Sequence, residues 1–514
     1  MSTPGLNPER RFSRTHRSAW SLGAGILGIA VQMLAGFFAT PWLLRFLGAR
    51  RFGAFRAMLD AFLWLSLLDS GLSRSLRANI AVRAGAGEEA AIQPLLAAGF
   101  RAYLRIGALA AAAGFGLAAL LPRVLAGSGL PAAEIRLATL LLALPAVWLP
   151  SRIYNALAEA SQRQYLVNSL LTLQAVLGTG MMLAAAARNW GLEGQAAAYS
   201  IAQLPTAWIL WRLGSRRYPG VAWVKPDPAA ARALRQLNWP GFLAALSESF
   251  ALQTGNLMAG WILGPAAVSP FFLTQRLAVF SQSFLYTLET STWAGLVELH
   301  SQGRSEPFYL RFCELTELTG ALSGVLLAPV CAYNPAFLAL WAGPQSYAGE
   351  AVNLLACINV WIGSVTAFWI ALLVGGGKVR LWMPCAFAFT AINLVVGVPA
   401  TFGFGAAGPL AGVLVGFLLV DSWALPRALG QSFDPRLRGI WPVALRPLAW
   451  VLPYAALLWT LARRYEPASW AALACQASAA GCGGILLWWA SLGQAKRRQW
   501  IERGQLLSGR WAKA

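Results

Sequence analysis

Ionisable side chains interrupt several long apolar segments of this chain. Arg56 and Asp60 are one helical turn apart, so their side chains can pair, and Arg276 and Asp421 lie in two later apolar segments. A charged group inside a membrane is costly, and it marks a substrate or ion pathway unless it pairs to fix helix packing. An arginine guanidinium binds phosphate oxygens through two parallel hydrogen bonds, whereas a carboxylate can carry a proton. These residues therefore predict either the binding of an anionic substrate or structural ion pairs.

Two apolar segments, 239–263 and 268–293, also carry rows of uncharged polar residues. In 239–263, the spacing of Ser249, Gln253 and Asn256 places them on one helix face, with Glu248 beside them. Such rows face a water-filled cavity or bond to a neighbouring helix, because lipid cannot satisfy them. The predicted substrate-binding set is Arg45, Arg56, Asp60, Glu248, Ser249, Gln253, Asn256, Gln275, Arg276, Gln282 and Tyr286, and the candidates for ion coupling are Asp60, Glu248 and Asp421.

The sequence patterns of enzymes and metal sites are missing. The six cysteines form no CxxC pair, and the two histidines, His16 and His300, lie outside the apolar segments proper. The chain has no Walker motif, no H-E-x-x-H motif and no nucleophile-elbow serine. We therefore predict no catalytic residue, no metal and no cofactor.

The composition requires a lipid environment. Charged residues make up 12% of the 514 residues and hydrophobic residues 57%, whereas charged residues account for about 25% of an ordinary soluble domain. The net charge of +21 is spread between apolar runs and does not form one patch, so it indicates contact with anionic lipid headgroups. Membrane lipids are thus expected partners, and nucleic acid is not.

Apolar runs of spanning length, about 20 residues each, predict fourteen transmembrane helices with Gly and Pro at most joints. The predicted spans are 19–44, 53–72, 96–121, 135–154, 165–187, 194–213, 239–263, 268–293, 312–333, 349–373, 381–401, 406–425, 447–462 and 469–492.

The distribution of basic residues predicts that both ends of the chain lie in the cytoplasm. Roughly three times as many Lys and Arg then fall on the inside as on the outside. The exception is the first outside joint, which holds Arg45, Arg50, Arg51 and Arg56. The segment 75–93 is expected to lie along the inner membrane surface as an amphipathic stretch.

The halves of the chain show a trace of duplication. Residues 45–55 resemble residues 261–271, an offset of 216 that matches Asp60 to Arg276. Six helices per copy would form a parallel repeat. We therefore expect an all-α membrane protein with two pseudosymmetric six-helix lobes around a central cavity. The predicted parts are a tail 1–18, an N-lobe 19–213, a basic linker 214–238, a C-lobe 239–425, a basic loop 426–446, two extra helices 447–492 and a basic tail 493–514.

Two joints carry a family resemblance. The first reads Pro41, Leu47-Gly48, Gly53 and then Asp69-Ser70-Gly71-Leu72, and the second is Leu340-Trp341-Ala342-Gly343-Pro344-Gln345-Ser346-Tyr347. In this order they resemble polysaccharide flippases of the multidrug/oligosaccharidyl-lipid/polysaccharide (MOP) exporter superfamily. The chain departs from that pattern at Pro265 and Pro270, where the superfamily more often keeps Gly and Tyr.

The resemblance implies a Wzx-type flippase of the bacterial inner membrane, working by alternating access. Its substrate would be an undecaprenyl-diphosphate-linked oligosaccharide, and its partners a polysaccharide polymerase and glycosyltransferases. A cation-coupled multidrug exporter of the same superfamily is an alternative, although it would have twelve helices. A membrane-bound polysaccharide polymerase is a third hypothesis. Such enzymes usually need a large outside loop or intramembrane histidines, and the sequence predicts neither here.

Overall fold

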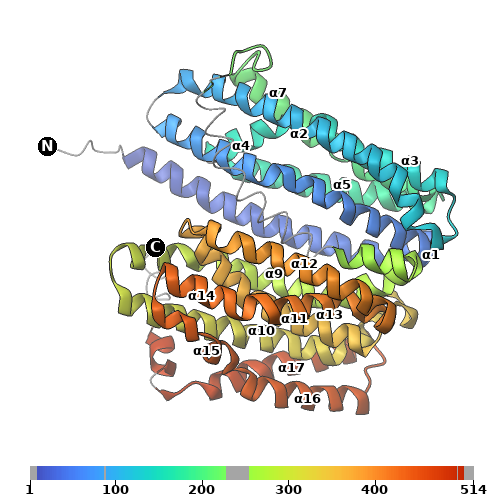
Figure 1. Cartoon of the computed structure of the whole chain (residues 1–514), viewed down its shortest axis with the longest axis vertical. Helices are drawn as coiled ribbons and strands as arrows, with labels where there is room; N and C mark the ends of the chain where they lie inside the picture. Colours follow the sequence, from blue (N-terminus) through green and yellow to red (C-terminus); the bar gives the residue numbers. More distant parts are fainter. Residues whose placement is uncertain are drawn as a thin grey trace. The chain divides into compact units, whose positions relative to one another are not determined.

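The computed structural model describes residues 8–85, 88–161, 163–226, 228, 254–494 and 496–502. Within these ranges the chain forms helices and turns and contains no strand (Figure 1). The predicted all-α class is therefore confirmed.

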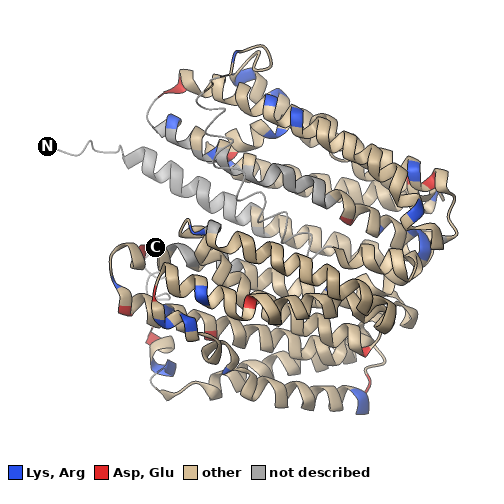
Figure 2. Ribbon diagram, viewed as in Figure 1, with Lys and Arg blue, Asp and Glu red and all other residues tan. Residues whose placement is uncertain are grey.

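Nine segments of the described chain are helical, long and apolar enough to cross a membrane. Leu381–Ser432, with 52 residues, would be about 78 Å long as one helix, against about 30 Å of hydrocarbon. It is a hairpin instead, because φ at Gly405 is 60° and the flanking helices α12 (Val379–Phe404) and α13 (Gly408–Gly416) pack together. Charged residues gather towards helix ends and leave the middle parts mostly uncharged (Figure 2). The chain is a multi-pass membrane protein.

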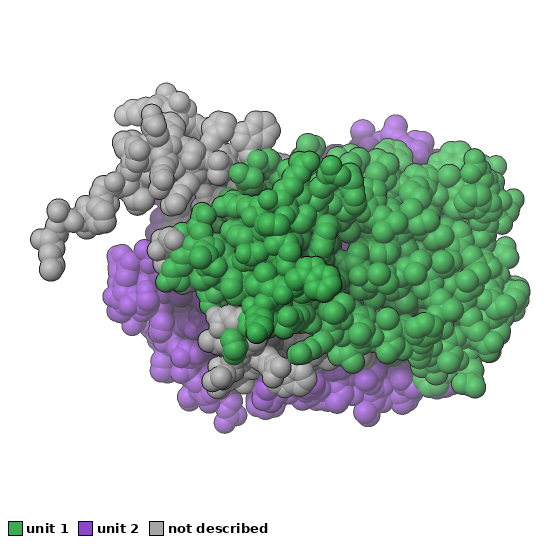
Figure 3. Space-filling view, turned by 90° about the horizontal axis from the view of Figure 1, so that it is seen from above, with its two compact units in different colours: residues 1–269 green, residues 270–514 purple. Residues whose placement is uncertain are grey.

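Helix occupies thirteen of the fourteen predicted spans, and the remaining one, 239–263, is described only from residue 254. The chain divides into two compact units, unit 1 (Met1–Ser269) and unit 2 (Pro270–Ala514) (Figure 3). The division falls just inside helix α9 (Pro265–Ser301), and the predicted linker 214–238 is described only in part.

Unit 1 begins with a helix that is broken once. Gly48 has φ 72° and ψ 162°, a backbone conformation essentially restricted to glycine. The break separates the first two predicted spans, as the Leu47-Gly48 joint predicts. The described helices of unit 1 are α1 (Pro8–Gly85), α2 (Glu89–Val124), η1 (Ala126–Ser128), α3 (Ala132–Ala143), η2 (Leu144–Ser151), α4 (Arg152–Ala160), α5 (Gln164–Ala187), α6 (Gly191–Ile201), α7 (Leu204–Arg217) and the start of α9.

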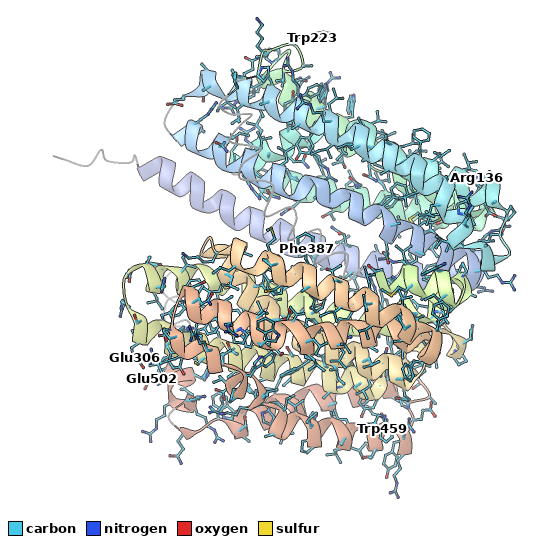
Figure 4. All side chains as sticks on the ribbon, in the orientation of Figure 1. Arg136, Trp223, Glu306, Phe387, Trp459 and Glu502 are labelled. Carbon is cyan, nitrogen blue, oxygen red and sulfur yellow. The ribbon has the colours of Figure 1, made fainter. Side chains whose placement is uncertain are left out.

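The prediction that 75–93 lies along the membrane surface is wrong. The helix after Gly48 continues to Gly85 and is about 55 Å long, so it extends beyond about 30 Å of hydrocarbon. Its apolar residues do not cover lipid, because they are buried against α2, α4 and the turn after α7. This cluster includes Leu76, Ile80, Ile92, Leu95, Ile153 and Val221. In the same turn Trp223 is 90% exposed (Figure 4).

Unit 2 contains the rest of α9 and the remaining helices. A π-helical turn interrupts the segment from α13 to α14. The elements after α9 are α10 (Ser305–Ala342), η3 (Pro344–Ser346), α11 (Glu350–Gly375), α12, η4 (Gly405–Ala407), α13, the π-turn η5 (Phe417–Asp421), α14 (Ser422–Ser432), η6 (Pro435–Gly439), α15 (Trp441–Leu445), α16 (Leu448–Arg464) and α17 (Trp470–Ser491).

The second sequence joint has a structural explanation in unit 2. Gly343 and Gly349 have φ of 90° and 105°, so they turn the chain between α10 and α11. The Ala348 N–H donates to the Thr274 hydroxyl at 2.8 Å, which attaches the joint to α9. The buried Asn334 amide donates to the carbonyl of Thr274 and to the Asn353 side chain, both at 2.7 Å. The joint is therefore a packing element.

Candidate functional site

A buried polar network joins α1 to the segment after residue 253 in unit 1. Arg56 forms a salt bridge with Asp60 at 3.0 Å, and the side chain of Asp60 is only 3% exposed. The Asn256 amide donates to the other carboxylate oxygen of Asp60. The predicted pairing of Arg56 with Asp60 is thus present, together with a third member.

Close backbone approach makes this network possible. A Cβ at Gly53 would lie 1.9 Å from the Pro265 carbonyl oxygen, so only glycine fits there. The Ser269 hydroxyl donates to the Ala49 carbonyl at 2.6 Å on the same contact. Helix α9 therefore meets α1 near the break in α1. The helical segment before α9, which carries Asn256, also packs on α1, because a Cβ at Gly260 would lie 3.7 Å from the Ala57 Cβ.

A cavity of about 410 Å³ lies within unit 1. Residues of α1, α2, α3, η2, α4, α5 and α6 and of the start of α7 line it, and this volume falls in the range of small-molecule sites. Its polar side chains include Ser73, Trp148, Ser151, Arg152, Asn155, Glu159, Gln174, Tyr199, Gln203 and Thr206.

Two buried polar atoms of this lining have no protein partner. They are the indole nitrogen of Trp148 and the side-chain oxygen of Asn155. Glu159, in contrast, is bound by Arg77 in a salt bridge. Since buried polar atoms are normally hydrogen-bonded, the two orphans point to an occupant of the cavity, water or ligand.

The polar network and the cavity are neighbours. Leu59 and Phe62, from the helix that carries Arg56, line the cavity. Tyr199 of α6 also lines it. The helix that carries Arg56 and Asp60 therefore also forms part of the cavity lining.

The structure places the other predicted residues in separate environments. Arg45 in unit 1 lies beside the Trp42 ring, with its guanidinium carbon 6.0 Å from the ring centroid. In unit 2, the Arg276 guanidinium lies 4.7 Å from the Phe280 ring and 5.5 Å from the Phe272 ring. In these cation–π contacts the negative face of each aromatic ring attracts the guanidinium.

Other predicted residues of unit 2 lie on α9 and on the π-turn η5. The Gln275 amide donates to the Phe271 carbonyl at 3.0 Å, and Gln282 faces Gly363 of α11. Tyr286 is 62% exposed, whereas Asp421 is buried at the end of the π-turn. Glu248, Ser249 and Gln253 lie outside the described residues. The role of the predicted set stays a prediction.

Sequence reasoning missed part of the cavity lining. Arg152, Trp148 and Tyr199 were not among the predicted site residues, because each lies near a span end, where basic and aromatic residues are common. One signal was present: Asn155 and Glu159 are four residues apart and share a helix face. At the end of the predicted span 135–154, Asn155, Glu159 and Gln162 are also typical of a solvated helix end, and that interpretation was favoured.

At another part of unit 1, an arginine of the first joint has a carboxylate partner. Arg51 donates to both oxygens of Glu134, at 2.9 and 3.4 Å, and the Leu192 N–H donates to Glu134 at 3.0 Å. An open groove of about 540 Å³ lies over this pair. The contact ties the joint to α3 and α6.

Among the described residues, no group of His, Cys, Asp and Glu could hold a metal ion.

Comparison with protein families assigns the chain. A family model described as "Polysaccharide biosynthesis protein" matches residues 21–293, more than half of the sequence. The chain belongs to this family. No curated protein matches this member of the polysaccharide biosynthesis family in sequence.

Solved transporter structures share the fold of this polysaccharide biosynthesis family member. An inward-facing multidrug resistance MATE family transporter of the MOP superfamily has a TM-score of 0.64 and 17% identity, covering 81% of this chain and 99% of its own. The lipid II flippase MurJ, in an inward closed conformation, has a TM-score of 0.66 and 8% identity over 93% and 99%. A MOP superfamily transporter from Pyrococcus furiosus has a TM-score of 0.58 and 15% identity over 83% and 96%. The predicted two-lobe, multi-helix fold is confirmed.

Proposed function

We propose that this protein is a flippase that moves an undecaprenyl-diphosphate-linked oligosaccharide from the inner to the outer leaflet by alternating access. The observation that carries the proposal is the match to the polysaccharide biosynthesis family over residues 21–293. The likeness to the lipid II flippase MurJ supports a lipid-linked substrate. Membership in a transporter fold supports movement of the substrate without chemical change.

The described spans contain polar groups of the kind that a substrate with a sugar head needs in order to cross the membrane. A sugar head cannot cross about 30 Å of hydrocarbon without polar partners. The buried Asp60, the half-buried Arg56 and Asn256, and the polar cavity of unit 1 supply polar surface within helices that are otherwise apolar. A diphosphate carries about two negative charges, and each gains about 2.3 kcal/mol per 100 mV on moving outward. Outward flipping is therefore favoured by an inside-negative membrane.

The test is reconstitution of the purified protein in vesicles that contain a lipid-diphosphate-linked oligosaccharide in the inner leaflet. Exposure of the sugar to an added sugar-oxidising enzyme measures its appearance outside. We expect protein-dependent exposure that becomes faster when an inside-negative potential is imposed. Exposure no faster than in protein-free vesicles would refute the proposal. Any cleavage or elongation of the glycan would favour a membrane-bound polymerase instead.

A second candidate is a cation-coupled multidrug exporter, because the structural likeness to the MATE transporter is nearly as close as that to MurJ. It predicts that the same vesicles accumulate or release a cationic dye along a proton or sodium gradient. Dye transport without glycan exposure would replace the first proposal by the second.

The cellular setting forms part of the proposal. We place both chain ends in the cytoplasm and the protein in the bacterial inner membrane, beside a polysaccharide polymerase and glycosyltransferases. Reporter fusions after residue 492 test the side of the C-terminal end. A reporter active only outside the cytoplasm would contradict this orientation.

A further inference from the structure

Two exposed arginines lie one helical turn apart on α2. Arg101 and Arg105 share a face with Leu104, Leu109 and Phe115, whose side chains are 55%, 63% and 67% exposed. The opposite face of α2 is buried within the protein. An exposed apolar row on a membrane-spanning helix contacts lipid, so both arginines belong to a lipid-facing surface.

The length of α2 places these arginines at the edge of the membrane. Arg123 lies at the other end of the helix, and a rise of about 1.5 Å per residue puts Arg105 about 27 Å and Arg101 about 33 Å from it. The hydrocarbon layer is about 30 Å thick. With Arg123 at one boundary, the other boundary falls between Arg105 and Arg101. An arginine at this depth extends its guanidinium to the headgroups, where the lipid phosphates lie.

Helix α7 runs antiparallel to α2 and contacts it at the same level. The rings of Phe100 in α2 and Trp211 in α7 have centroids 5.9 Å apart. Further along α7, Arg217 forms a salt bridge at 3.5 Å with Glu89 at the start of α2. The end of α7 therefore lies beside the start of α2, and both reach the same membrane boundary.

A third arginine, Arg212 of α7, faces the same side as Arg101. One residue step rotates a helical side chain by about 100°, and in antiparallel helices this step turns both side chains toward one side of the pair. Arg101 follows Phe100 and Arg212 follows Trp211, so the two guanidinium groups lie on one surface. Arg212 lies over the exposed Trp208 ring, 5.4 Å from its centroid. The basic patch is defined as Arg101, Arg105 and Arg212.

The turn after α7 adds an aromatic anchor and a further cation at the edge of the basic patch. Arg101 donates to the Val224 carbonyl at 3.3 Å, which attaches the turn to α2. On either side of Val224, Trp223 and Lys225 are exposed (Figure 4). An exposed tryptophan is typical of the interface between membrane and water. The turn thus lies at headgroup level, in agreement with the length of α2.

The basic patch carries an excess of positive charge. Among the described residues none of its arginines has a carboxylate partner, whereas Arg51, Arg56, Arg77 and Arg217 of unit 1 each have one. The adjoining sequence 225–253 holds three basic and two acidic residues, so it adds a net positive charge. A lipid phosphate supplies the counter-charge, and a guanidinium binds its oxygens through two parallel hydrogen bonds.

We propose that the basic patch binds the phosphate of an anionic phospholipid from the adjoining leaflet. The three arginines hold the phosphate, and an acyl chain lies along the apolar row of Leu104 and Leu109. The ligand is a leaflet lipid because the arginines border a lipid-facing row at headgroup depth. This binding goes beyond the proposed function and does not depend on it, since the patch would hold the lipid whether or not the protein moves a glycan.

The experiment measures lipid binding to the purified full-length protein by native mass spectrometry. The probes are phosphatidylglycerol, the zwitterionic phosphatidylethanolamine, undecaprenyl diphosphate and inorganic phosphate. We expect phosphatidylglycerol to occupy its first site at a lower concentration than any of the other three. Equal binding of phosphatidylethanolamine, or displacement of phosphatidylglycerol by an equal concentration of inorganic phosphate, would overturn the assignment. Tighter binding of undecaprenyl diphosphate would replace the phospholipid by the substrate lipid.

Paired variants locate the site. The double variant Arg101→Gln with Arg105→Gln should weaken the first phosphatidylglycerol site by about 30-fold, at about 5-fold for each arginine near an anionic surface. Arg212→Gln, on the other helix, should weaken it by about 5-fold. The matched control is Arg123→Gln with Arg136→Gln, which removes two exposed arginines at the other end of unit 1 (Figure 4). This control should bind as the wild type does.

The control distinguishes a site from a general attraction to a basic protein. If both double variants weaken binding equally, the net charge of the protein holds the lipid and the inference is overturned. A phosphatidylglycerol with a photoreactive group beside its glycerol should also crosslink to 99–116 or 204–225. Crosslinks found only elsewhere in the chain would equally overturn it. Glycan exposure in vesicles, measured separately, decides the proposed function and leaves this inference unaffected.

Discussion

Removing the carboxylate of Asp60 should destabilise the protein more than removing the hydrogen bond that Asn256 donates to it. In Asp60→Ala, the Arg56 guanidinium loses a partner 3.0 Å away in a place where its side chain is 28% exposed. Breaking a buried ion pair on one side costs about 3–5 kcal/mol. Partial exposure lets water solvate Arg56, so we expect the lower end, about 3 kcal/mol. This corresponds to about a 100-fold change in the folding equilibrium.

The same network supplies two comparisons. Asn256→Leu removes one interhelical hydrogen bond, which in membranes is worth about 0.6 kcal/mol and at most about 1.7. The double variant Arg56→Met with Asp60→Leu removes both charges together and should be close to the wild type in stability. Unfolding in detergent with increasing denaturant ranks the variants, and glycan exposure in vesicles gives their activity.

The double variant also decides whether the pair of Arg56 and Asp60 fixes helix packing or acts in transport. If it is stable and still flips glycan, Arg56 and Asp60 only fix helix packing. If it is stable and inactive, the charges act in transport. The reasoning is refuted if Asp60→Ala alone is as stable as the wild type, because losing the salt bridge to Asp60 at a half-buried position must cost Arg56 free energy.

Three further effects follow from local geometry. Gly48→Ala should cost about 1–3 kcal/mol from backbone strain alone, because φ is 72° there and nothing lies within 4 Å of the added Cβ. Gly53→Ala should cost about 3 kcal/mol or more and lower the yield of folded protein, because its Cβ would overlap the Pro265 carbonyl. Hydrogen bonds from Arg436 lower the pKa of Asp434 below 3.8. Its contribution to stability is therefore present above about pH 4 and lost as pH falls through the lower folded pKa, so Asp434→Asn should flatten the decline of unfolding temperature in acid.

Local patterns predicted the joints of this fold well. Gly48 was expected to separate two spans, and its positive φ breaks α1 at that residue. Arg56 and Asp60 were expected to pair from their spacing alone, and they form a salt bridge. Such features could be predicted because they depend on residues within a turn or two of each other.

Contacts between distant segments could not be predicted. The Asn256 partner of Asp60 lies 196 residues away, and the packing of its helical segment on α1 near Ala57 brings the two together. The cavity of unit 1 combines residues of eight elements, each with few polar groups of its own. The row in α4 looked like a solvated helix end because periodicity reports which residues share a face but not what that face meets.

Asp421 shows a further limit of periodicity and offers a last test. It ends the π-turn Phe417–Asp421, and each residue that such a turn adds rotates the following side chains by about 100° relative to an α-helix. Regular α-helical spacing would therefore place Asp421 on the wrong face of the helix. In the structure the Asp421 side chain is buried. Asp421→Asn keeps the shape and removes the charge. If Asp421 carries a coupled proton, glycan exposure in this variant should lose its dependence on a pH gradient while the protein stays folded. If glycan exposure keeps the same pH-gradient dependence and only the unfolding temperature changes, the residue serves packing and not ion coupling.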